Sequence, residues 1–154
     1  MIAHCKRTNL RGFTLIELLV VIGILAVLLA ITLIAINPAR QFSQANNAKR
    51  ASDTNAILNA IHQFSVDNHG ILPAGVPATA SAIASGGLAD LCDDLVPEYI
   101  AALPSDPQTN NGENVLEADC VSYDTGYEVV EDGNSRVTVS APDAELGETI
   151  AVTR

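Results

Sequence analysis

An apolar run near the amino terminus constrains this chain more than any other feature. Residues 13–36 read FTLIELLVVIGILAVLLAITLIAI, and Glu17 is the one charged residue among them. A run of about 20 apolar residues is long enough to cross a bilayer as a helix. A single segment satisfies its own backbone hydrogen bonds in lipid only as a helix, so the β-branched residues do not argue for a strand. The sequence therefore predicts a transmembrane helix over 13–36.

The acid within this run needs an explanation. An acidic residue at the centre of an inserting helix costs about 2.5 to 3.5 kcal/mol, so a carboxylate in hydrocarbon usually has a partner or a task. The preceding residues 1–12 carry Lys6, Arg7 and Arg11 and no acid. Positive charge beside a span favours the cytoplasmic side of the membrane. We therefore expect the amino terminus to lie in the cytoplasm and the bulk of the chain on the far side.

The sequence RGFTLIE at positions 11–17 resembles the class III signal of type IV pilins and type II secretion pseudopilins. In that family, prepilin peptidase cuts after the glycine and methylates the new amino-terminal phenylalanine. The resemblance implies that residues 1–12 are a leader peptide, that cleavage falls between Gly12 and Phe13, and that Phe13 becomes N-methylated. It also implies that Glu17 acts in subunit assembly.

A physical argument supports that role for the acid. Cleavage would free an amine at Phe13, one helical turn from Glu17, at a spacing where groups on a helix meet. In a stack of parallel helices the amine of one subunit could equally pair with Glu17 of its neighbour, which would set the axial register. Two alternatives stay open: an uncleaved anchor helix, and a conventional secretory signal. The second fits poorly because the apolar core of such a signal is about 7 to 15 residues long.

Beyond the run the sequence turns polar, and residues 37–69 show an amphipathic pattern. Apolar residues recur at the spacing of one helix face. They are Ala45, Ala48, Ala51, Ile57, Ile61 and Phe64. Pro38 is expected to bend the helix because proline removes one backbone hydrogen bond, and Gly70 is expected to end it. We expect one long helix over about 13–69, whose second half packs on a globular head of residues 70–154.

The first part of the head is predicted to be a loop and a short helix. Residues 70–87 are small and punctuated by proline and glycine, which predicts a surface loop with a short Ala-rich helix at 79–85. Leucines at one-turn spacing then predict another short helix that ends at Pro97. The segments 95–100 and 103–107 resemble the link between helix and sheet in pilin and pseudopilin heads.

The last third of the chain has the pattern of strands. Residues alternate over 121–130, and a turn signal follows at 131–134. The segments 136–140 and 149–153 predict two further strands. A three- or four-stranded antiparallel sheet packed on the second half of the long helix follows. This α+β arrangement is the pilin fold that the resemblance implies.

Two of the three cysteines, Cys92 and Cys120, lie outside the leader. An even count in a small exported head favours a disulfide between them. The ring would contain 29 residues, counted inclusively. A zinc site is the alternative, but two isolated cysteines without clustered histidines do not complete one.

Charge and motifs weigh against nucleic-acid binding and catalysis. Without the three leader bases, five bases remain against 18 acids, a net charge of −13. Such a surface repels nucleic acid, so no direct nucleic-acid binding is expected. His62 and His69 are two helical turns apart, which is the wrong spacing for a zinc-chelating pair. No nucleophile elbow, phosphate loop or dinucleotide fingerprint occurs, so we expect no enzymatic activity.

No metal or other cofactor is expected, with calcium as the alternative. Acids in the last third of the chain could bind calcium, as loops of some major pseudopilins do. They are Asp119, Asp124, Glu131 and Asp132. These acids lack the regular ligand spacing of an EF-hand, and the pseudopilin calcium segment is not recognisable.

The sequence as a whole predicts a major pilin-like structural subunit. The resemblance implies a single-pass protein of the cytoplasmic (inner) membrane that interacts with lipid, prepilin peptidase and a pilus assembly platform, and then joins a helical homo-oligomer on the cell surface. The small residues Gly23, Ala26 and Ala30 would let neighbouring helices approach closely. Alternatives are a pseudopilin of a type II secretion or competence system, a minor pilin and, more remotely, an anchored binding module that does not polymerise.

Overall fold

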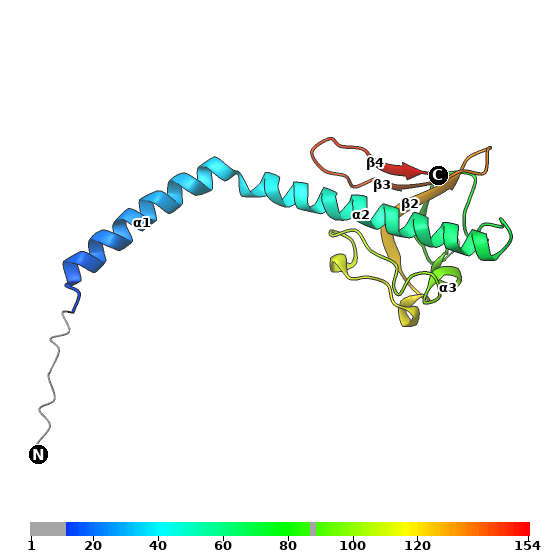
Figure 1. Ribbon diagram of the computed structural model, residues 1–154, viewed down its shortest axis with the longest axis horizontal. Coiled ribbons are helices and arrows are strands. Elements are labelled where there is room, and N and C mark those ends of the chain that lie inside the picture. Colours follow the sequence, from blue (N-terminus) through cyan, green and yellow to red (C-terminus); the bar gives the residue numbers. More distant parts are fainter. Residues whose placement is uncertain (1–11, 87–88) are drawn as a thin grey trace, which may run out of the picture. The chain divides into compact units, whose positions relative to one another are not determined.

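The computed structural model describes residues 12–86 and 89–154, and the chain divides into two compact units. The first unit ends at Pro38 and contains helix α1, Leu15–Ile36. The second comprises Ala39–Arg154 and is built on helix α2, Pro38–Asp67 (Figure 1). The leader predicted at 1–12 lies outside the described residues, apart from Gly12.

The predicted helical stretch is divided in two at Asn37. This residue adopts a left-handed backbone conformation with φ 48° and ψ 79°. Pro38 follows directly, and proline disfavours the α conformation in the residue before it. Asparagine is one of the few residues that tolerate the left-handed region. The helix is therefore interrupted before the proline, where the sequence predicted a bend within one helix.

Besides α2, the second unit contains a four-stranded antiparallel sheet with the strand order β1-β2-β3-β4. The strands are β1 (Ser81–Ala84), β2 (Asp124–Glu131), β3 (Val137–Ala141) and β4 (Ile150–Thr153). Val139 of β3 pairs with Val129 of β2 on one side and with Val152 of β4 on the other. The predicted α+β pilin fold is confirmed.

Strand β1 corrects one prediction. The segment 79–85 was expected to form a short helix because it is rich in alanine, but Ser81–Ala84 form a strand that pairs with β2. A helix this short has too few hydrogen bonds to offset its nucleation. Pairing with β2 instead buries Ile83 completely, and Thr125 Oγ1 donates a 2.9 Å hydrogen bond to the Ile83 carbonyl.

The core lies between the second half of α2 and the sheet. Ile57, Leu58 and Ile61 of α2 are fully buried. The sheet contributes alternate residues, as expected for strands with one covered face, and β3 is buried at its first, third and fifth positions. The residues that fill the rest of the core include Leu91, Leu95, Leu103, Tyr127, Val129, Val137 and Val139.

The first half of α2 departs from the predicted apolar stripe. Ala45 and Ala48, which were expected to face the head, are exposed. The buried side chains here are those of Asn47, Arg50 and Thr54. Alanine contributes little apolar area, so in this half of α2 the polar side chains decide which face packs against the head.

Short elements fill the chain between β1 and β2. They are α3 (Cys92–Leu95) and the 3₁₀ turns η1 (Asn110–Gly112) and η2 (Glu117–Asp119). The helix predicted before Pro97 is thus only four residues long. Lys49 of α2 links the segment around η1 to α2. Its Nζ donates hydrogen bonds to the carbonyls of Ser105 at 3.2 Å and Gly112 at 3.3 Å.

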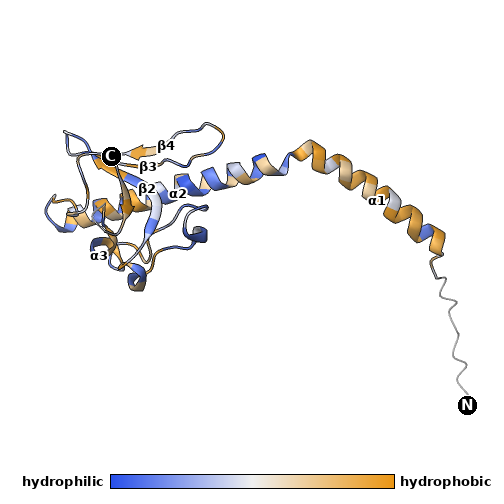
Figure 2. Ribbon diagram, turned by 180° about the vertical axis from the view of Figure 1, so that it is seen from behind, coloured by the Kyte–Doolittle hydropathy of each residue, from blue (hydrophilic) through white to orange (hydrophobic). Residues whose placement is uncertain are grey.

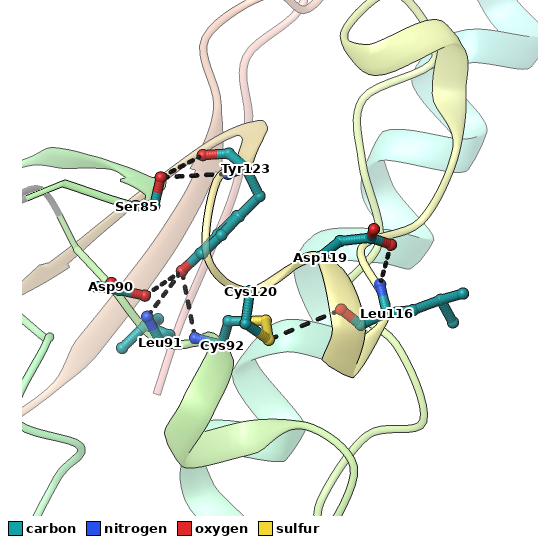
Figure 3. Close-up of a disulfide and its surroundings, with 8 residues drawn as sticks. All are labelled: Ser85, Asp90, Leu91, Cys92, Leu116, Asp119, Cys120 and Tyr123. Atoms are coloured by element: carbon teal, nitrogen blue, oxygen red, sulfur yellow. Dashed lines mark hydrogen bonds between the residues drawn. A yellow bond between two sulfur atoms is a disulfide. The ribbon is translucent and has the colours of Figure 1, made fainter.

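The predicted disulfide between Cys92 and Cys120 is present, with a Cα–Cα distance of 5.4 Å (Figure 3). Tyr123, three residues after Cys120, aligns the two segments. Its phenol oxygen accepts hydrogen bonds from the N–H groups of Leu91 at 3.0 Å and Cys92 at 3.2 Å, and it donates to Asp90 Oδ1 at 2.8 Å. Burial raises the pKa of Tyr123, so the phenol stays protonated as a donor.

Removing both cysteines should destabilise the head markedly. For a ring of this length, the chain-entropy model predicts that the Cys92→Ala, Cys120→Ala double variant loses about 3 to 4 kcal/mol of unfolding free energy. Urea titration of the full chain in detergent measures this. All three tyrosines (Tyr99, Tyr123 and Tyr127) lie in the second unit and the chain has no tryptophan, so tyrosine fluorescence reports on the head alone. Reducing the parent chain should give the same loss, and an unchanged midpoint would contradict the prediction.

Candidate assembly site

The first turn of α1 is closed by three reciprocal hydrogen bonds between Thr14 and Glu17. Thr14 is the N-cap, and its Oγ1 accepts from the Glu17 N–H at 3.2 Å. Glu17 Oε2 accepts in return from the Thr14 N–H at 2.8 Å and from the Thr14 hydroxyl at 2.7 Å. This capping box satisfies backbone donors that have no intrahelical partner at a helix start.

Sequence analysis did not identify Thr14 as part of this site, although its signal was present. The pattern Thr-x-x-Glu before an apolar run is the signature of a capping box, and residues 14–17 match it. Glu17 therefore has a partner within its own chain. Pairing of its charge with a neighbouring subunit is a separate role that stays a prediction.

The predicted cleavage point lies just outside the helix. Gly12 and Phe13 are exposed and precede the N-cap, so the bond between them belongs to non-helical chain. A peptidase binds its substrate most readily where the backbone is not already engaged in a helix. Cleavage at this bond and methylation of Phe13 stay predictions.

The apolar side chains of α1 are exposed around the whole helix. No residue of α1 is buried within the chain, and Figure 2 shows the helix as hydrophobic along most of its length. Among the described residues, α1 is the one helix long and apolar enough to cross a membrane by length and composition. Apolar surface of this extent needs a cover other than water, which lipid or other apolar helices can provide.

Comparison with known proteins identifies the family. A family model described as a prokaryotic N-terminal methylation motif matches residues 7–33, which include Gly12, Phe13 and Glu17. The chain is also 32% identical over 138 residues to the type II secretion system core protein G of Escherichia coli strain K12, an alignment that covers 89% of this chain and 85% of that protein. The chain belongs to the type IV pilin and pseudopilin family. No solved structure matches this pilin-family chain significantly.

The head of this pilin-family protein contains a buried charged cluster around Arg50. The guanidinium is fully buried, and its Nε and Nη2 donate to the two carboxylate oxygens of Asp106, with Nη2 3.1 Å from Oδ1. Its Nη1 donates to Asn47 Oδ1 at 3.0 Å and to Glu145 Oε2 at 3.1 Å. Hydrogen bonding to Asp106 raises the pKa of Arg50 above the already high value of a free arginine, so the guanidinium stays charged. Sequence analysis missed this cluster.

Glu145 also fastens the loop between β3 and β4 to α2. Its carboxylate accepts from the Ser43 hydroxyl at 3.1 Å and from the Asn46 amide at 2.9 Å. Its backbone N–H and carbonyl each make a 2.9 Å hydrogen bond to the side chain of Asn47. We call Ser43, Asn46, Asn47 and Glu145 the loop strap. The hydrogen bond from Asn46 is the main cause of a lowered pKa at Glu145, so the stabilisation it provides is lost as pH falls through that pKa.

Asp53 of α2 is a second polar anchor to the sheet. Its Oδ2 accepts a 2.8 Å hydrogen bond from the Tyr127 hydroxyl. Burial raises the pKa of Asp53 against the lowering effect of that bond, and burial likewise raises the pKa of Tyr127. Tyr123 and Tyr127 are both buried, and each donates a hydrogen bond to an aspartate.

The raised pKa of Asp53 predicts a specific pH dependence of folding. An unfolded aspartate has a pKa of about 3.9, and the pKa of folded Asp53 lies above it. Between these two pKa values, Asp53 binds more protons in the folded state than in the unfolded state. The unfolding free energy contributed by Asp53 therefore falls as pH rises through this window. The Asp53→Asn variant lacks this titration. Urea titrations at a series of pH values measure the unfolding free energies of the parent chain and the variant. The value for the parent minus the value for the variant should fall as pH rises through the window. A difference that does not change with pH would contradict the prediction.

The other predicted candidates are not brought together. His62 lies on α2, and its buried Nε2 has no hydrogen-bond partner, whereas His69 follows the helix in a left-handed conformation with φ 59°. Asp119 and Asp124 line one hollow, and Glu131 lines another. Within residues 12–86 and 89–154, no three histidine, cysteine or acidic side chains are grouped so that they could hold a metal ion.

Proposed function

We propose that this chain is a major pilin-like structural subunit that polymerises through α1 into an extracellular, type IV pilus-like filament. In this proposal prepilin peptidase cuts between Gly12 and Phe13 and methylates Phe13. The processed chain then sits as a single-pass protein in the cytoplasmic membrane, with its head on the outer side. An assembly platform moves it from the membrane into the filament.

The observation that carries this proposal is the uniform apolar exposure of α1. Lipid and a bundle of identical helices cover such a surface equally well, so a subunit can pass from membrane to filament without exposing α1 to water. The charge on Glu17 needs a partner in both states, and the amine of processed Phe13 on a neighbouring copy is a suitable one.

A second candidate is favoured by the relative in Escherichia coli. That protein is named a core protein of the type II secretion system, and the similarity extends along most of both chains. By analogy, this chain would be a pseudopilin of a secretion system rather than the subunit of a surface pilus. Both candidates polymerise through α1. They differ in whether the polymer extends from the cell surface as a pilus or serves a secretion system as a pseudopilus.

Deleting the gene in the native host and looking for two phenotypes separates the candidates. We expect filaments that bind an antibody to the head along their length, seen by immunogold electron microscopy, and their loss on deletion with secreted proteins unchanged. Loss of secreted proteins without any surface filament would favour the pseudopilin. If neither phenotype appears, the non-polymerising anchored module replaces both.

A further inference from the structure

The outer edge of β4 carries backbone groups that the sheet does not use. β4 is the last strand of the sheet, so it pairs with β3 on one side only (Figure 1). Arg154, directly after β4, exchanges two backbone hydrogen bonds with Val137, at 2.8 and 3.0 Å. Such pairs alternate with non-bonded pairs along an antiparallel ladder. The N–H and C=O groups of Ala151 and Thr153 therefore point away from the sheet, and no other described segment forms backbone hydrogen bonds with them.

Apart from its short length, the segment around β4 lacks the features that commonly protect an edge strand. Proteins often place a charge, a proline or a covering segment there. Residues 149–153 read TIAVT and contain neither charge nor proline, although the second unit has five bases against 17 acids. The other edge strand, β1, is partly covered, because the Ala89 N–H donates a 3.0 Å hydrogen bond to the Ala82 carbonyl. β4 is therefore the more available edge of the sheet.

The face of β4 toward the core is incompletely covered at this edge. Ile150 and Val152 pack against the core but are only partly buried. Val139, which pairs with Val152 from β3, is fully buried because it has strands on both sides. A further strand beside β4 would bring side chains against Ile150 and Val152 and remove more of their surface from water.

The two ends of this segment carry opposite charges on the side facing α2. Glu148 Oε2 accepts a 3.0 Å hydrogen bond from the amide of Asn47, and Arg154 Nη1 donates one of 2.6 Å to Asn59 Oδ1. Both asparagines belong to α2, so these contacts and the loop strap hold the segment in place. Each contact uses one oxygen or one nitrogen of the charged group. The remaining atoms of both groups can bind a second partner.

We propose that β4 pairs antiparallel with β4 of a second copy of this chain, about a two-fold axis at Ala151. This register places Ala151 opposite the partner's Ala151 and Thr149 opposite the partner's Thr153. The outward backbone groups of the two strands then form hydrogen bonds with each other. One segment supplies both sides of the contact, as a two-fold interface requires.

The side chains favour this register. It places Ile150 beside the partner's Val152, so that the partly buried apolar residues cover each other. It also places Glu148 opposite the partner's Arg154, and the two-fold axis repeats this pair of opposite charges. With the axis at Ile150 instead, Gly147, whose φ of 71° is not that of a strand, would enter the ladder, and Arg154 would face an uncharged residue.

The contact joins heads that run in opposite directions. It involves the second unit alone, so it does not depend on the filament function proposed above. Copies along one helical filament all run in the same direction and are not related by a two-fold axis of this kind. Within the proposed function, the contact would therefore join two neighbouring filaments of opposite direction.

Cysteine cross-linking of the full chain in detergent tests the pairing and its register. Opposite residues that exchange backbone hydrogen bonds have Cα atoms about 5.5 Å apart, within the range of a disulfide. In a chain that also carries Cys5→Ser, we expect Ala151→Cys to form disulfide-linked dimers on mild oxidation. Thr149→Cys is the matched control, because two copies of this residue would lie about 14 Å apart. It should form few dimers alone but should form them when mixed with Thr153→Cys.

Two results of this experiment would overturn the proposal. One is the absence of dimers from Ala151→Cys. The other is an equal yield from Ala151→Cys and Thr149→Cys, which would show contact without a defined register. Neither result involves filament formation, so the proposed function would stand unchanged.

Charge reversal tests the predicted pair of Glu148 and the partner's Arg154. Either Glu148→Arg or Arg154→Glu alone should lower the dimer yield of the Ala151→Cys chain by about fivefold, because like charges then face each other twice. The double reversal restores opposite charges and should restore the yield. A yield that stays low in the double reversal would overturn the proposed register, because it would trace the loss to the weakened contacts with α2.

Discussion

Replacing Glu17 with valine is expected to block filament assembly and leave membrane insertion intact. In a bundle of α1 helices the amine of processed Phe13 would lose its counter-charge, and an unpaired charge in an apolar surrounding costs about 2.5 to 3.5 kcal/mol, or on the order of a hundredfold in filament yield. Insertion should persist because the variant helix is more apolar than the parent. Immunoblots of sheared and membrane fractions measure both quantities.

The capping box in the structure makes controls for this experiment necessary. Glu17→Gln keeps the side chain that closes the box with Thr14 but removes the charge. Thr14→Ala keeps the charge and weakens the cap, at a cost of about 1 kcal/mol. We expect Glu17→Gln to lose filaments as Glu17→Val does, and Thr14→Ala to retain most of them. Normal filaments from Glu17→Gln would show that Glu17 acts by capping alone, which contradicts a role in register.

Among single substitutions, the largest effect on folding is expected for Asp106→Asn. Arg50 is fully buried and cannot shed its proton, so loss of the opposing carboxylate leaves a buried charge that is only partly compensated by Glu145. Breaking such a pair costs about 3 kcal/mol or more, a large part of the 5 to 15 kcal/mol that typically stabilises a domain. Asparagine can still accept at Oδ1 the 2.8 Å hydrogen bond from the Gln108 N–H, so the local turn is kept. Urea titration followed by tyrosine fluorescence measures the loss.

The exposed pair of Arg136 and Asp132 provides the matched control. The two side chains form an ion pair but are 60% and 33% exposed. Exposed pairs contribute about 0 to 1 kcal/mol, so Arg136→Met should shift the urea midpoint only slightly. Equal effects of Arg136→Met and Asp106→Asn would contradict the importance given to burial of the Arg50 pair.

The features that sequence analysis predicted well rest on strong local signals. The length and composition of 13–36 define α1, and the alternating residues with their turn signal define the hairpin of β2 and β3. An even number of cysteines in a head that was expected to be exported led to the Cys92–Cys120 pair. In each of these cases the sequence pattern and the fold demand the same structure.

The features that were missed depend on contacts between distant segments. Asp106 and Glu145 are 56 and 95 residues from Arg50, and no spacing rule connects them. Strand β1 exists because β2 lies beside it, although its alanines favour a helix when taken alone. The capping role of Thr14 is a different kind of omission, because its signal is local and could have been found in the sequence.

We propose that the chain is processed after Gly12 and incorporated into an extracellular filament. Mass spectrometry of the amino-terminal peptide, in material sheared from intact cells, tests it most directly. We predict a peptide that begins at methylated Phe13 in the sheared fraction. A chain that begins at Met1 and stays with the membranes would contradict the claim.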